Sequence, residues 1–438
     1  MSRSALDPRE VLLSSPMSAY QQMGVAVAVA LCLLDGFEVF AATFAAPAIK
    51  AAWGVNQAQI GLVLSAGLLG MAAGSLAIAP AADVVGRRRL LFLSLALMII
   101  GDACSANTRS VQALMVTRLF TGLGIGPMIA VVSSLVAEYS NARRRDLCLT
   151  MFGAGFPVGG ILGGFYAAYL LPVYGWHAIF LTAALLGLVM SMVVYLLLPE
   201  PIAPMIARPR ADTLLKVNTY LKRCGLASIE ELPAPPQDAS SVPFSALFKP
   251  GMAALTILIM SIYFLHVVTL FFAQTWVPSL IANEGIPATE AALAGVLVNI
   301  GGICGGLLLG ATSTRLGLKP LVVAAMAGGA IMTALFGSIP PNFILLAGGA
   351  AGMGFFLQGA MMGLYAVVAR TFPAQMRVSG TGLVIGIGRI GSAAGPALAG
   401  ALLGGGVTRN IVAVTMGAPA LAAALLLLKF RLSPPDTP

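Results

Sequence analysis

Long apolar stretches and short polar ones alternate along the whole chain. Six apolar stretches lie before residue 200 and six after residue 250, namely residues 22–47, 58–80, 90–107, 111–138, 147–171, 177–198, 251–282, 289–312, 319–338, 342–369, 378–403 and 407–428. About 20 mostly apolar residues make a helix long enough to cross a bilayer. The pattern therefore predicts an all-α membrane protein with 12 transmembrane helices.

A polar segment divides these helices into two sets of six. We expect residues 22–199 to form a first bundle and residues 251–428 a second one. Residues 200–248, which are rich in proline and charge, are expected to form the loop that connects them. Residues 1–21 and 429–438 are expected to form polar tails.

The connecting loop contains one amphipathic stretch, residues 211–223. Its apolar side chains are Leu214, Leu215, Val217 and Leu221, and its basic ones are Lys216, Lys222 and Arg223. A strip of apolar residues opposite a basic one is typical of a surface helix. The rest of the loop reads as a tether between the bundles.

The composition supports a membrane location. Of the 438 residues, 58% are hydrophobic and 9% are charged, and the mean hydropathy is +0.93. In a soluble domain about a quarter of the residues are charged. Residues 1–19 contain charges and no apolar core, so we expect no cleavable signal peptide. The five cysteines form no CxxC motif and are expected to pack as small apolar residues.

The distribution of basic residues predicts the orientation. Of the 25 lysines and arginines, only Lys50, Arg109 and Arg409 fall in loops on the side opposite the termini, and Arg118 and Arg389 fall inside helices. The other 20 lie on the side of the termini. Cytoplasmic loops of membrane proteins carry such an excess. Both termini are therefore expected in the cytoplasm, and the net charge of +9 reflects topology rather than a nucleic-acid partner.

The two halves of the chain repeat one another. A turn at Asp83–Gly86 is matched by one at Thr314–Gly317, and Gly122 is matched by Gly354, at offsets of 231 or 232 residues. A near-constant offset over half of the chain indicates a duplication. Parallel six-helix repeats with a site at their interface are a transporter architecture.

The repeated turn carries a family resemblance. Residues 79–88 read Ala-Pro-Ala-Ala-Asp-Val-Val-Gly-Arg-Arg, and the chain resembles the major facilitator superfamily, whose signature here is roughly G-x-x-x-D-R-x-G-R-R. The residues that match it are Asp83, Gly86, Arg87 and Arg88 in the first copy, and Arg315 and Gly317 in the second. The resemblance implies a gating loop that latches the halves on the cytoplasmic side. Ala79, Val84 and Thr314 depart from the signature and imply a weaker latch.

A narrower resemblance is to the aromatic acid:proton symporter family. Its first helix typically carries D-G-[FY]-D, and residues 35–38 read Asp-Gly-Phe-Glu. Residues 274–278 (Gln-Thr-Trp-Val-Pro) and 377–391 are also similar to that family. The resemblance implies import of a small aromatic carboxylate together with a proton. Glu38 is one methylene longer than the family's usual second aspartate.

Asp35 and Glu38 are the candidate proton-coupling residues. Ionisable groups inside membrane helices are costly and mark functional sites. Residues three apart share one helix face, so the two carboxyl groups are expected to lie close together. A buried carboxylate next to a second one can bind and release a proton. The alternative is that one of the two only pairs with an arginine.

Arg118 and Arg389 are the two arginines inside predicted helices, one in each half. Arginine binds a carboxylate through two parallel hydrogen bonds. Arg118 either binds the substrate carboxylate or is the counter-ion of Asp35 or Glu38. Arg389 is expected to bind the substrate carboxylate or to pair across the halves.

Several weaker candidates lie in the second half. Further substrate-binding residues are expected to be Gln274, Trp276, Gln358 and Tyr365, which could bond a ring hydroxyl or pack on a ring. His266, in mid-helix, reads as a satisfied polar contact rather than a proton relay. Asp102 and Glu138 lie near helix ends and are expected at the membrane interface.

These residues predict a secondary active transporter of the bacterial inner membrane that works by alternating access. Its expected partners are a small organic acid, protons and the lipid bilayer, and a monomer is expected to function. We expect no cofactor, no metal site and no enzymatic activity, since the chain has no phosphate-cradling motif and no metal-ligand or nucleophile constellation. Two alternatives remain open, a drug or metabolite/proton antiporter and a sensor that does not transport.

Overall fold

The computed structural model describes residues 7–207, 212–233, 244–250, 252–373 and 376–429. Twelve helices in this part of the chain are long and apolar enough to cross a membrane. Those of the first half are α2 (Ala19–Trp53), α3 (Gln57–Ala77), α5 (Arg87–Ala106), α6 (Val111–Tyr139), α7 (Arg145–Tyr174) and α8 (His177–Leu197). Those of the second half are α11 (Ala253–Ala282), α12 (Ala288–Leu316), α13 (Leu318–Ser338), α14 (Phe343–Thr371), α15 (Arg377–Gly404) and α16 (Arg409–Lys429). The predicted fold of 12 membrane helices in two bundles is confirmed.

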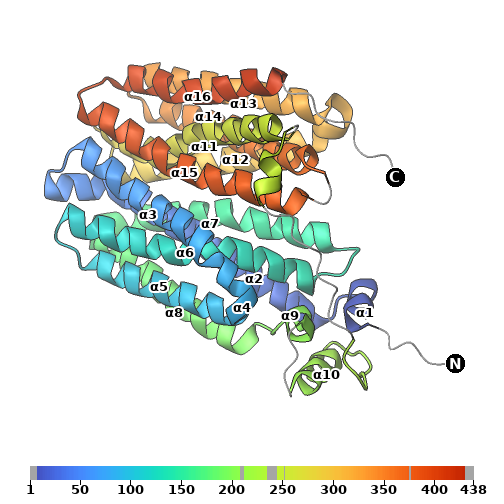
Figure 1. The fold of residues 1–438 in the computed structure, drawn as a ribbon. Coiled ribbons are helices and arrows are strands. Elements are labelled where there is room, and N and C mark those ends of the chain that lie inside the picture. The colour runs from blue at the N-terminus through green and yellow to red at the C-terminus, as the bar shows by residue number, and fades with distance from the viewer. Residues whose placement is uncertain (1–6, 208–211, 234–243, 251, 374–375, 430–438) are drawn as a thin grey trace.

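The two bundles lie side by side with their helices roughly aligned (Figure 1). In a bilayer the backbone groups must be satisfied within each spanning segment, which favours helices throughout. Polar residues mark where helices begin and end. Ser18 and Asn56 each form a capping box at the start of α2 and α3, and Gly54 ends α2 with φ +61°. The chain therefore reverses direction within a few residues.

The halves meet mainly where α3 packs on α15, α7 on α12 and α2 on α11. The α3–α15 contact depends on two glycines, because a Cβ on Gly61 would lie 2.8 Å from the Cα of Gly400. Ser65 Oγ, one turn further along α3, donates a hydrogen bond to the carbonyl of Ala393 at 2.8 Å. Small residues thus allow the two helices to approach each other closely.

Three short helices form a small cluster at the terminal end, by which we mean the end of the bundle where α2 begins and α16 ends (Figure 1). They are α1 (Pro8–Ser14), α9 (Ile202–Ala207) and α10 (Thr213–Arg223). The predicted surface helix is α10, and it buries Val217 and Leu221 against the other two. Leu215, however, is 72% exposed, and Tyr220 takes its place on the packed face.

The candidate gating loop lies at the terminal end as a repeated sharp turn. Gly86 and Gly317 have φ values of +98° and +83° and directly precede α5 and α13. Arg87 forms an ion pair with Glu138 of α6, and Arg88 donates to the carbonyl of Tyr195 in α8 at 2.6 Å. Both arginines therefore bind within the first half.

In the second copy of this loop, Arg315 is exposed. The side chain of Asp83 lies outside the described residues. The role of the loop as a latch between the halves stays a prediction.

Candidate substrate cavity and buried charge network

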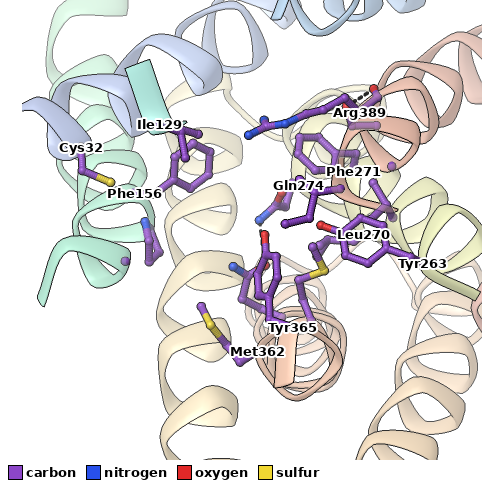
Figure 2. Close-up of a pocket in the computed structure, with 18 of the residues that line it drawn as sticks. Cys32, Ile129, Phe156, Tyr263, Leu270, Phe271, Gln274, Met362, Tyr365 and Arg389 are labelled. Carbon is purple, nitrogen blue, oxygen red and sulfur yellow. Dashed lines mark hydrogen bonds between the residues drawn. The ribbon is translucent and has the colours of Figure 1, made fainter. Parts of the chain in front are cut away.

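A central cavity of about 310 Å³ lies between the two halves. Figure 2 shows Cys32, Ile129 and Phe156 of the first half on one side of it and Tyr263, Gln274 and Tyr365 of the second half on the other. The volume is at the lower end of the range of about 300–1,000 Å³ that is usual for small-molecule sites. The cavity is mostly apolar, with a few polar groups that come from the second half.

Arg389 of α15 is the cation of this cavity. In Figure 2 its side chain reaches from α15 toward Ile129 and Phe156 on the far side. Within the described part of the chain, its guanidinium donates one hydrogen bond, to the sulfur of Met71 at 3.3 Å, and a thioether is a weak acceptor. Gly388 makes room beside it, because a Cβ there would lie 2.1 Å from the ring of Tyr263. Arg389 is thus left with unused donors that point into the cavity.

Two amides and two phenols form the polar wall of the cavity. Gln274 Nε2 donates to Gln358 Oε1 at 3.3 Å, and this contact joins α11 to α14. The rings of Tyr263 and Tyr365 lie 6.1 Å apart at an angle of 59°. Gln274, Gln358 and Tyr365 therefore lie where the sequence predicted substrate contacts, and Tyr263 joins them.

Trp276 does not line the cavity, although the sequence predicted it as a substrate contact. Its side chain is fully buried, and its indole Nε1 donates to the carbonyl of Pro396 in α15 at 3.1 Å. Two positions along α11 from Gln274, it faces a different neighbour. Trp276 therefore links α11 to α15 within the second half.

His266 is also buried outside the cavity. Its Nε2 lies 3.0 Å from the carbonyl of Leu357, so this nitrogen carries the proton and donates it. The contact joins α11 to α14. This is a polar contact of the kind that the sequence favoured, and no partner among the described residues reaches the other ring nitrogen, Nδ1.

Arg118 lies in the core of the first half rather than in the cavity. Its Nη1 contacts Asp102 Oδ1 at 2.6 Å, and its Nη2 donates to the backbone carbonyl of Glu38 at 3.0 Å. The guanidinium carbon lies 5.2 Å from the centre of the Phe180 ring. The counter-ion of Arg118 is thus a residue that neither sequence-based alternative named.

Asp102, which the sequence predicted at the membrane interface, is buried inside the first half. Its side chain is 0% exposed, and its Oδ1 also lies 3.4 Å from the hydroxyl of Thr121. The sequence held a signal for this pair, because Asp102 lies a few residues before the end of α5 and Arg118 a few residues after the start of the adjacent α6. Successive antiparallel helices bring such positions to a similar depth in the membrane. Glu138, in contrast, is partly buried at the terminal end.

Asp35 and Glu38 are both buried in α2, with exposed fractions of 1% and 0%. Within the described residues, no donor reaches Asp35 Oδ1 or either carboxyl oxygen of Glu38. Arg389 acts electrostatically on Asp35, and the carboxyl groups of Glu38 and Asp102 act on each other. The carboxyl groups of Asp35 and Glu38 also act on each other. Asp35 therefore interacts both with Arg389, which lines the cavity, and with Glu38, which lies near Arg118. These charged residues form a single network.

The network defined by Asp35, Glu38, Asp102, Arg118 and Arg389 contains three acids and two arginines. With every group ionised it carries one excess negative charge. Burial of an uncompensated charge is costly, so a buried carboxyl group without a counter-ion binds a proton instead. The network is therefore neutral when it holds one proton.

Comparisons with known proteins agree with this architecture. The family model of the Major Facilitator Superfamily matches residues 28–283 and 259–438. A gallate transporter of Pseudomonas putida is 30% identical over 97% of this chain and 94% of its own length. The 4-hydroxybenzoate transporter PcaK of Acinetobacter baylyi is 30% identical over 97% of this chain and 94% of its own length. A 3-(3-hydroxy-phenyl)propionate transporter of Escherichia coli is 27% identical over 94% of both chains.

Solved structures share the fold. The partially occluded inward-open conformation of the xylose transporter XylE from E. coli has a TM-score of 0.70 at 17% identity and covers 94% of this chain and 98% of that one. The fold and the relatives are those of multi-pass transporters of the bacterial inner membrane. The chain belongs to the major facilitator superfamily.

Proposed function

We propose that the protein is a proton symporter that imports a small aromatic carboxylate. The observation that carries this proposal is the position of Arg389, a partly buried cation with unused donors beside Tyr263 and Tyr365. A desolvated carboxylate needs a fixed cation and hydrogen bonds to offset the loss of water. The names of the relatives, which include transporters of gallate and 4-hydroxybenzoate, support the same substrate class.

The proposed substrate pose places the carboxylate on Arg389 and the ring among the aromatic side chains. Gln274 and Gln358 then bind ring hydroxyl groups, since their mutual contact at 3.3 Å is long enough to exchange for a substrate contact. Arg118 lies away from the cavity and belongs to the coupling network in this scheme.

Coupling follows from competition for Arg389. Asp35 is the acid on which Arg389 acts when no substrate is bound. When a substrate carboxylate binds Arg389, Asp35 loses the positive charge that balances its own. The network then becomes neutral again by binding one more proton. We therefore propose that Asp35 and Glu38 couple the movement of one proton to that of each carboxylate, in an electroneutral step that a monomer can perform.

The contacts between the halves support an alternating-access scheme. At the end opposite the terminal end, Lys50 Nζ donates to Asn283 Oδ1 at 2.7 Å, and Gly61 packs on Gly400. At the terminal end, Arg87 and Arg88 bind within the first half. With cytoplasmic termini, which we propose from the basic residues, this arrangement corresponds to a conformation closed toward the outside.

Transport by the purified protein in liposomes tests the proposal. Labelled 4-hydroxybenzoate should exchange against unlabelled substrate at equal pH, and an alkaline interior should drive its accumulation without a response to membrane potential. Accumulation driven by an acidic interior would instead indicate an antiporter. Binding without exchange would indicate a sensor. Reporter fusions after residues 89 and 109 should give cytoplasmic and external signals, respectively, if the termini are cytoplasmic.

A further inference from the structure

We propose that Lys50 attracts the substrate carboxylate to the entrance of the transport pathway. Lys50 lies at the end of the bundle opposite the terminal end, which is the external end if the termini are cytoplasmic. The inference rests on the proposed function, because it requires an anionic substrate that enters from this end. It adds a second cation to the pathway, outside the cavity that holds Arg389.

The first step in support is the position of Lys50 at the junction between the halves. Lys50 belongs to the last turn of α2, and its side chain is partly buried. Its Nζ donates to Oδ1 of Asn283, the residue that ends α11 in the second half, at 2.7 Å. When the halves separate at this end, the ammonium group loses that acceptor and remains at the mouth of the pathway.

The second step is charge. Asn283 is a neutral acceptor, and no ion pair joins Lys50 to an acid within the described part of the chain. Glu284, the acid that follows Asn283, is paired with Arg409 instead, whose Nη1 lies 3.2 Å from Glu284 Oε1. The charge of Lys50 is therefore not neutralised. A cation at an opening raises the local concentration of anions and the rate at which they enter.

The third step is the fixed position of Asn283. Arg409, which forms the ion pair with the adjacent Glu284, also donates through Nε to the carbonyl of Gly337 at 3.1 Å. These contacts tie the start of α16 to the end of α13 and to the turn after α11. Asn283 is thus held within the second half, so Lys50 loses this acceptor when the halves move apart.

The fourth step is the difference between the two cations of the pathway. The ammonium group of Lys50 is a compact, strongly hydrated point charge, whereas the guanidinium of Arg389 can form two parallel bonds to a carboxylate. Lys50 therefore holds the acid loosely at the mouth, and the acid moves on to the stronger site in the cavity. Lys50 then binds Asn283 again as the external end closes.

Two substitutions separate the charge of Lys50 from its contact with Asn283. Lys50→Gln removes the charge but keeps an N–H donor, whereas Asn283→Ala removes the contact but keeps the charge. Initial uptake of labelled 4-hydroxybenzoate by cells that express the protein reports entry from the external face alone. Ionic strength is varied while sucrose keeps the osmolality constant.

The KM of the wild type should rise with ionic strength, because salt at about 0.15 M screens charges beyond about 8 Å. At low salt, Lys50→Gln should raise the KM by about 5- to 10-fold and remove most of this salt dependence. Its dissociation constant, measured by calorimetry on the purified protein, should hardly change, since a charge at the rim acts mainly on the association rate. Lys50→Arg and Asn283→Ala should keep the salt dependence of the wild type.

Arg109→Gln is the matched control. Arg109 is an exposed cation at the same end of the first half, in the turn between α5 and α6. Its substitution removes the same charge from the external face, but not from the junction between the halves. The KM should change by less than about twofold, because steering depends on charge close to the opening.

Three results would overturn the role of Lys50. One is that Lys50→Gln and Asn283→Ala raise the KM alike and keep its salt dependence, since Lys50 then acts only through the contact. Another is that Arg109→Gln matches Lys50→Gln, since the net charge of the face is then sufficient. The third is a wild-type KM that does not respond to salt. Absence of saturable uptake by the wild type would instead reject the proposed function together with this role.

Discussion

The two halves of the molecule share one fold but use their buried polar residues differently. The first half holds three buried acids and Arg118 within its own core, and none of them lines the cavity. The second half holds Arg389 with two amides and two phenols, and these face the cavity. We propose that one copy of the duplicated bundle holds the proton-binding groups and the other the carboxylate-binding groups.

This difference between the halves suits the coupling of proton movement to substrate movement in a duplicated fold. A rocking motion of two rigid bundles moves the cavity-lining residues relative to each other. Groups buried inside one bundle keep their contacts during such a motion. Within the charge network, Asp35 and Arg389 lie in different halves, so such a motion changes the distance between them.

Removal of Arg118 should have the largest effect on stability. Arg118→Ala leaves Asp102 buried without its cation, and loss of one partner of a buried pair costs about 3–5 kcal/mol. We expect a large fall in the midpoint of thermal unfolding. Arg389→Ala, in the cavity, should cost less, because Arg389 is only partly buried and its hydrogen bond to the sulfur of Met71 is weak. If the two variants lost the same amount of stability, the two arginines would not differ in their contribution to folding.

Substitution of Arg389 should have the largest effect on substrate binding. Lysine keeps the charge but cannot form two parallel bonds to a carboxylate. Hydrogen bonds to charged groups contribute about 1.5–3 kcal/mol, so Arg389→Lys should weaken binding by about 10- to 100-fold, measured by calorimetry. An ester of the substrate should bind poorly to the wild type and lose little more in the variant.

Arg118→Lys is the matched comparison for this binding measurement. It keeps the cation beside Asp102 and lies outside the cavity, so it should bind substrate within about threefold of the wild type, a difference of less than about 1 kcal/mol. If it weakens binding as much as Arg389→Lys does, then Arg118 contacts the substrate in another conformation.

The sequence predicted the helices, the repeat and the residues of the cavity better than it predicted the contacts inside each bundle. Apolar stretches of about 20 residues need no knowledge of packing to be recognised. Arg389, Gln274 and Gln358 stand out because polar groups are rare inside such stretches. A helix that is apolar on all sides does not reveal which way each side chain points. This is why Trp276 was placed in the cavity and Asp102 at the interface.

The amides of the cavity should have a moderate effect on binding. Gln358→Leu and Gln274→Leu each remove a donor and an acceptor that we assign to a ring hydroxyl, which contributes about 0.5–1.5 kcal/mol. Binding of 4-hydroxybenzoate should weaken by about 2- to 10-fold in each variant, while binding of benzoate, which has no hydroxyl group, should hardly change. Equal losses for both acids would show that the amides act through packing instead.

Trp276→Phe should have the smallest effect on binding and is the sharpest check on the boundary of the cavity. Trp276 is fully buried in α11, and its indole donates to the Pro396 carbonyl of α15. Phenylalanine keeps an aromatic ring there but leaves that carbonyl without the indole donor, at a cost of about 1 kcal/mol. We therefore expect a lower unfolding midpoint with an unchanged dissociation constant for the acid. A loss of affinity without a loss of stability would place the indole against the substrate, as the sequence first suggested, and would extend the binding surface beyond the cavity seen in Figure 2.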